Sequence, residues 1–293
     1  MLSLNEEWLD AHLSENPPDT YSFSLIGDDH SALDHQLFWQ THEHGSDGTV
    51  RVSGGNLNYL MISVDQNAAR PVLSVKRLAN RVPHLVLPGV THTGDNGILG
   101  GNAATMQKVY PRIKEALDIA NKQAYGALAS AWQAETDVWG QKNSDQCCST
   151  IVFSLHHPGG RKVEDSLILI KDQKVVDNQQ SLSSVNDGLE PRQPIQNDTT
   201  PSSISFYVNF ANFLQTYPHR VEISVNSGSD EITYPPAIYD VLAGTSAAID
   251  PNEFSYVRVT LKRQPQDTYE VIPFTQNVDI HKRWPPLPKP NGP

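Results

Sequence analysis

Two short motifs bring together the residue types that acid–base catalysis needs. Asp47 stands in Gly45-Ser46-Asp47-Gly48-Thr49-Val50, and His92 stands in Gly89-Val90-Thr91-His92-Thr93-Gly94. A carboxylate beside an imidazole orients the ring and stabilises its charged form, so that the ring can take a proton from a hydroxyl nucleophile. Each motif also has a simpler interpretation, because Asp before Gly is typical of tight turns and His92 is one of 11 histidines.

The segments before the two motifs have the patterns of β-strands. Residues 21–27 alternate apolar and polar side chains and end in an apolar run, and residues 84–90 form a second apolar run that stops just before His92. A third possible strand, residues 59–64, lies in the excursion between them. Each motif thus follows a predicted strand, and the acid precedes the base along the chain. This order favours the catalytic interpretation.

The two motifs resemble those of a known enzyme family. The first resembles the Asp-Gly-x-Val turn of bacterial lipase-like and phospholipase-like α/β-hydrolases, and the second resembles the Gly-x-x-His loop after their final strand. The resemblance covers residues 46–101, roughly the first third of the chain. It implies the C-terminal part of an α/β-hydrolase sheet, catalytic roles for Asp47 and His92, an ester or lipid substrate and no cofactor.

The nucleophile that such an enzyme needs is not recognisable. No Gly-x-Ser-x-Gly occurs, and too few residues precede Asp47 for the βα units that should come before the acid. Gly244-Thr245-Ser246 is the nearest approach, but it follows His92 and we interpret it as a loop. The chain is then a C-terminal fragment, a late-starting reading frame or a remnant that binds without catalysis, and its start in an apparent helix before a strand favours truncation.

The rest of the chain predicts an all-β part joined to the first by helix. Residues 105–142 have helical spacing, as one helix or a broken pair with Gly126 as the weak point, and residues 149–274 contain short strands typical of a β-sandwich. A polar loop is expected at residues 177–202. The predicted fold class is α/β plus all-β, with a hydrolase-like part (1–104), a helical connector (105–146), a β-sandwich domain (147–280) and a Pro-rich tail (281–293).

Other kinds of site have weaker support. Histidines and acids between residues 28 and 44 could ligate a metal, but their spacing matches no familiar site, so we predict none; these residues are Asp28, Asp29, His30, Asp34, His35, His42, Glu43 and His44. A net charge of −11 without a basic cluster argues against nucleic acid as a partner. The adjacent Cys147 and Cys148 are expected to be reduced thiols.

Two functions therefore follow from the sequence. The first is a serine hydrolase of esters or phospholipids that this chain completes only in part. The alternative is a non-catalytic binding module, whose β-sandwich recognises a protein, lipid or glycan. Since the sequence has no secretory signal and no run of about 18 apolar residues, we expect a cytoplasmic protein, or one exported without a Sec signal, and no transmembrane segment.

Overall fold

The computed structural model describes residues 20–29, 45–67, 72–78, 81–163, 166–172, 195–197, 200–209, 219–226, 232–235, 237–239, 250–265 and 272–273. Ser246, the Pro-rich tail and the histidines between residues 30 and 44 lie outside these ranges. Within them, no helix is long and apolar enough to span a membrane. Cys147 and Cys148 are both buried, and neither forms a disulfide in the part of the chain that the structure describes.

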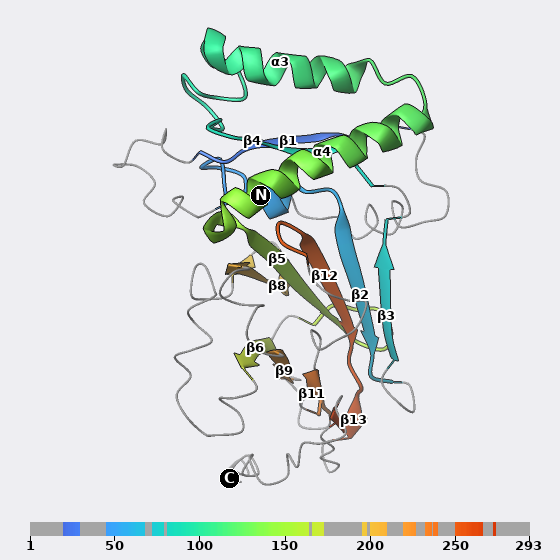
Figure 1. Ribbon diagram of the computed structural model, residues 1–293. Helices are drawn as coiled ribbons and strands as arrows, with labels where there is room; N and C mark the ends of the chain where they lie inside the picture. Colours follow the sequence, from blue (N-terminus) through green and yellow to red (C-terminus); the bar gives the residue numbers. More distant parts are fainter. Residues whose placement is uncertain are drawn as a thin grey trace.

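The two strands that precede the motifs pair with each other. β1 (Ser24–Gly27) and β4 (His84–Leu87) form a parallel two-stranded sheet, and Figure 1 shows this sheet between the helices α3 (Ala103–Leu117) and α4 (Lys122–Lys142). All four residues of β4 are buried. Leu85 and Leu87 pack with Trp132 of α4, whereas Val86 packs on the other face with Trp139. A strand with apolar side chains on both faces therefore lies in the interior and ends at the histidine loop.

A mixed six-stranded sheet forms the centre of the molecule (Figure 1). Its order is β3 (Val72–Arg77), β2 (Tyr59–Asp65), β12 (Phe254–Thr260), β5 (Cys148–His156), β8 (Thr200–Asn209) and β7 (Ile195–Asn197). β12 runs parallel to β2 and to β5, and the other pairs are antiparallel. The central strands therefore come from both ends of the chain.

A second sheet packs against the first. Its order is β14 (Ile272–Pro273), β11 (Ala237–Tyr239), β9 (His219–Val225) and β6 (Ser166–Asp172), and β10 (Ile232–Thr233) pairs with β13 (Gln264–Pro265) nearby. Ile168 of β6 and Ile223 of β9 share one buried cluster with Phe153 of β5 and Val259 of β12. The rings of Phe153 and Phe206 meet edge to face at 5.7 Å within it. The two sheets thus bury a common apolar core.

Three sequence expectations differ from the structure. The strand predicted at residues 59–64 is present as β2, but β2 and β3 join the six-stranded sheet and not the sheet of β1 and β4. The helical region is a pair, but it breaks after Leu117 and not at Gly126, since Asn121 caps a new helix by accepting a hydrogen bond from Ala124 N. The end of the predicted polar loop forms β7 and the start of β8.

Candidate active site

The end of β1 is in close contact with the segment that follows β4. Gly27 ends β1, and a Cβ there would lie 1.8 Å from the carbonyl oxygen of Val90, so only glycine allows this close approach. Just beyond, Asp29 N donates a hydrogen bond to Val90 O at 3.1 Å. The chain that leads to Asp47 and the chain that leads to His92 therefore leave the sheet side by side.

The acid lies in a tight turn that its own side chain stabilises. Gly48 has a φ of 90°, which favours glycine, and Asp47 N donates to Val50 O at 3.1 Å. One carboxylate oxygen, Oδ1, accepts hydrogen bonds from Thr49 N at 3.0 Å and from Val50 N at 2.7 Å. Asp47 is only 3% exposed, and these hydrogen bonds from its own turn hold its carboxylate in one orientation.

The second carboxylate oxygen faces the base. His92 Nδ1 lies 3.1 Å from Asp47 Oδ2, and His92 N donates a backbone hydrogen bond to Asp47 O at 3.0 Å. An ionised carboxylate only accepts hydrogen bonds, so Nδ1 carries the proton and Nε2 is the basic nitrogen. The His92 side chain is 29% exposed. The predicted proximity of these two side chains is therefore present, with Nε2 on the side away from the acid.

The acid turn is also held from the central sheet. Tyr207 of β8 donates its hydroxyl hydrogen to Gly45 O at 3.2 Å, and Val52 N, at the start of α2 (Val52–Gly55), donates to the same oxygen at 2.8 Å. Gly45 has a φ of 69°, and a Cβ there would lie 2.3 Å from Gln146 O. The position of Asp47 therefore depends on the six-stranded sheet as well as on β1.

Two further polar residues support the strands, and the sequence interpretation missed their roles. Asp28 accepts hydrogen bonds from Gly89 N and from Trp139 Nε1, each at 2.6 Å, and so joins the end of β1 to the histidine loop and to α4. His84 begins β4, and its Nδ1 lies 3.1 Å from Ser24 Oγ. Complete burial lowers the pKa of His84 to about 4, so its ring is neutral near pH 7.

The structure describes few of the residues that were considered as metal ligands or as the nucleophile. Asp28 is occupied by Gly89 and Trp139, and the histidines that would join it lie outside the described ranges. Among the described residues no group of three or more His, Cys, Asp or Glu side chains has the arrangement of a metal site. Ser246 likewise lies outside those ranges.

Comparison with solved structures identifies the class of fold as that of a phospholipase-like α/β protein. Two structures of phospholipase PlaB from Legionella pneumophila, one of them in complex with thio-NAD, match 89% of this chain with a TM-score of 0.72 and 21% sequence identity. The chain spans 61% and 60% of the length of those two chains. No protein-family model and no curated protein sequence matches it.

Proposed function

We propose that this chain supplies the acid and the base of a serine hydrolase that cleaves ester bonds in lipids. The observation that carries the proposal is the Asp47–His92 pair, with 3.1 Å between Oδ2 and Nδ1 and with His92 partly exposed. Both residues follow the ends of adjacent parallel strands, where the α/β-hydrolase fold holds its acid and base.

In this proposal each residue has its own step. His92 Nε2 takes the proton of a serine hydroxyl as that oxygen attacks the ester carbonyl, and then gives the proton to the leaving alcohol. In the second half of the reaction it takes a proton from the water that attacks the acyl group, and it returns that proton to the serine oxygen as the free acid leaves. Asp47 Oδ2 keeps the ring in the Nδ1–H tautomer and stabilises the imidazolium that forms.

In this proposal the nucleophile is a serine outside these 293 residues. The sequence has no Gly-x-Ser-x-Gly, and the chain spans only part of the length of the similar phospholipase. The oxyanion-hole donors include the backbone N–H after the nucleophile and would come from the same missing segment. The 293 residues are then one part of a larger enzyme, and the strands of residues 147–280 form two packed sheets together with β2 and β3.

Phospholipids are the proposed substrate class, because the fold is similar to that of a phospholipase over 89% of the chain. The competing proposal, a binding module without catalysis, makes no use of the paired orientation of Asp47 and His92. We therefore prefer the hydrolase, with the second sheet helping to place the lipid.

A comparison of two forms of the protein tests the proposal. The 293-residue chain is expected to be inactive toward a chromogenic short-chain ester and toward phospholipid vesicles. A form extended upstream to include a Gly-x-Ser-x-Gly segment should hydrolyse both, and His92→Ala should reduce turnover by about 10⁴–10⁶-fold. An extended form that folds but stays inactive would favour the binding module, and robust turnover by the 293-residue chain would contradict a nucleophile from outside.

A further inference from the structure

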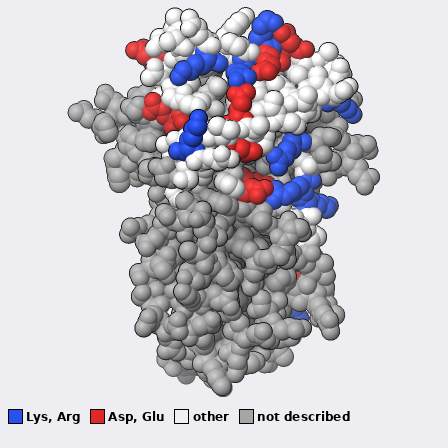
Figure 2. Space-filling model, in the orientation of Figure 1, with Lys and Arg blue, Asp and Glu red and all other residues white. Residues whose placement is uncertain are grey.

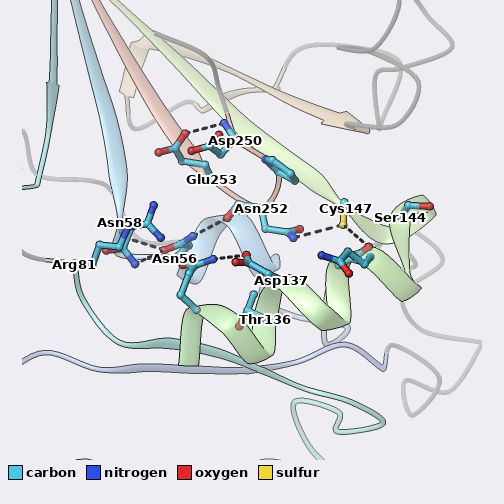
Figure 3. Close-up of a pocket in the computed structure, with 14 residues that line it drawn as sticks. Asn56, Asn58, Arg81, Thr136, Asp137, Ser144, Cys147, Asp250, Asn252 and Glu253 are labelled. Atoms are coloured by element: carbon cyan, nitrogen blue, oxygen red, sulfur yellow. Dashed lines mark hydrogen bonds between the residues drawn. The ribbon is translucent and has the colours of Figure 1, made fainter. Parts of the chain in front are cut away.

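A polar cavity lies on α4, and neither Asp47 nor His92 lines it. It has a volume of about 540 Å³ and lies between α4, the loop before β2 and the turn before β12 (Figure 3). This volume is within the range of small-molecule sites, which is about 300–1,000 Å³. Most of the lining residues have polar side chains, and none of them is aromatic. We name this space the α4 cavity.

One wall of the α4 cavity is fixed by side-chain amides. Asn58 Nδ2 donates to Val82 O and Asn58 Oδ1 accepts from Val82 N, both at 2.8 Å. Asn56 Oδ1 accepts from Asn58 N, and Asn56 Nδ2 donates to Asn252 O at 2.8 Å. The loop before β2 is thereby tied to the turn before β12, so this wall is rigid before any ligand binds.

A buried hydrogen-bond acceptor in the lining has no partner. Asn252 is 6% exposed, its Nδ2 lies 3.6 Å from Cys147 Sγ, and its Oδ1 has no partner among the described residues. Its backbone has a φ of 60°, which side chains other than glycine rarely adopt. A buried acceptor without a donor costs free energy. A donor on a ligand would satisfy this oxygen.

Charged groups of both signs surround that acceptor. Figure 3 shows Asp250 on one wall and Asp137 of α4 on the other, with Asn252 between them and Arg81 at the end beside Asn58. Asp137 and Arg81 are exposed, and the Asp250 side chain is 57% exposed. Arg81 has no partner among the described residues, whereas the buried Glu253 is already held by Arg77 and by Asp250 N. Asp137 Oδ1 already accepts a hydrogen bond from Gln133 Nε2 at 2.7 Å, and Asp250 Oδ2 pairs with Arg77 at 3.5 Å, so one oxygen of each carboxylate remains without a partner among the described residues. A ligand can therefore bind these two oxygens, the amide oxygen of Asn252 and the guanidinium of Arg81.

The charges on the face drawn in Figure 2 do not account for the two signs of charge in the α4 cavity. Figure 2 shows acidic and basic side chains interspersed over the described part of this face, without a large patch of one sign. The separation of charge inside the α4 cavity is thus a local feature. A guanidinium binds carboxylate or phosphate oxygens in a fork, while carboxylates and an amide oxygen bind the N–H groups of an ammonium.

We propose that the α4 cavity binds a small zwitterion, a molecule that carries both a primary ammonium and an anionic group. The ammonium donates to Asn252 Oδ1 and to the carboxylates of Asp137 and Asp250, and the anionic group pairs with Arg81. A quaternary ammonium has no N–H to donate and is bound by aromatic cages, which this lining lacks. The site does not depend on the proposed hydrolase chemistry. Its ligand could derive from a phosphoethanolamine headgroup or from a free amino acid.

Calorimetric titration of the whole chain tests the zwitterion. The two probes are O-phosphoethanolamine and L-serine, and the comparison compounds are ethanolamine, inorganic phosphate and O-phosphocholine. At least one probe should bind at least 10-fold more tightly than each comparison compound, and the preferred probe identifies the source. Absence of binding by both probes, or equal binding of ethanolamine or O-phosphocholine, would overturn the proposal.

Three variants locate the binding. Asp137→Asn and Arg81→Gln change exposed side chains and should each weaken binding at least 10-fold without affecting folding. Asn252→Gly preserves the positive φ, removes the unpaired oxygen and should weaken binding several-fold. The matched control is Glu135→Gln on the same helix, because Glu135 pairs with Arg112 outside the lining and its loss should leave affinity unchanged. Affinity that is unchanged in Asp137→Asn and Arg81→Gln would also overturn the proposal.

Discussion

At the scale of single residues, the two oxygens of Asp47 have different tasks. Oδ1 accepts both backbone hydrogen bonds of the turn, whereas Oδ2 faces His92. The simple interpretation of Asp-Gly as a turn and the catalytic interpretation are therefore both compatible with this geometry. Substitutions that remove the role of Oδ2 alone, or the roles of both oxygens, therefore separate the effect on catalysis from the effect on stability.

Asp47→Asn should preserve the fold and abolish most activity of the extended form. The amide oxygen can still accept from Thr49 N and Val50 N, but an NH₂ group facing Nδ1 favours the wrong tautomer, which costs about 10⁴-fold in kcat. Asp47→Ala should lose a similar factor and also about 1–2 kcal/mol of unfolding free energy, because the turn loses its acceptor. Ester hydrolysis and thermal unfolding of both variants check this, and equal stability losses would contradict it.

The candidate pair could be predicted because its evidence is local. Asp47 and His92 each stand in a short motif after a predicted strand, and their order along the chain, acid before base, matches that of the α/β-hydrolase triad. Asp28 and His84 could not be predicted in the same way. Their roles depend on Trp139 and Ser24, which are distant in sequence, and a polar residue beside an apolar run has many possible partners.

At the scale of elements, β4 buries a titratable group in its first position. His84 is fully buried with a pKa lowered to about 4, and its Nε2 has no partner among the described residues. In the unfolded chain the ring has a pKa near 6.5. Below pH 6.5 the unfolded state therefore binds more protons than the folded state does. The free energy of unfolding consequently decreases as the pH falls from 6.5 toward 4.

Replacement of His84 should reduce this acid sensitivity. Between pH 7 and pH 4.5 the burial of His84 costs about 2 kcal/mol of unfolding free energy. In His84→Gln this component disappears, so the variant should lose about 2 kcal/mol less than the wild type over the same interval. Urea unfolding at the two pH values measures the difference. Equal losses of unfolding free energy in the wild type and in His84→Gln would show that His84 is not the titrating group.

Two glycines in neighbouring elements provide opposite tests of packing. Gly27→Ala places a Cβ against Val90 O and should cost about 1–3 kcal/mol or more, because backbone must move. Gly126→Ala lies within α4, has nothing within 4 Å of the new Cβ and should add about 0.5–1 kcal/mol. Thermal unfolding of the pair gives the sign of each change. Stabilisation by Gly27→Ala would contradict the close contact between β1 and the histidine loop.

At the scale of the whole molecule, the strands were easier to predict than their partners. Periodicity indicated strands near β2, β5 and β12, but it does not tell which strands pair. β12 lies between β2 and β5, so Val257 pairs with Ile62 far back in the chain. The predicted boundary near residue 104 therefore separates strands of one sheet. Tyr207 of that sheet also supports the acid turn, which joins the candidate active site to the central fold.

Covalent labelling by a fluorophosphonate tests the central claim most directly. The oxygen of a base-activated serine attacks the phosphorus of this reagent and displaces fluoride, and mass spectrometry locates the resulting phosphonyl-serine adduct. We predict that the extended form is labelled on the serine of a Gly-x-Ser-x-Gly outside these 293 residues, and that His92→Ala slows labelling at least 100-fold. Labelling of Ser246, or labelling whose rate does not depend on His92, would contradict the assignment of Asp47 and His92 as acid and base.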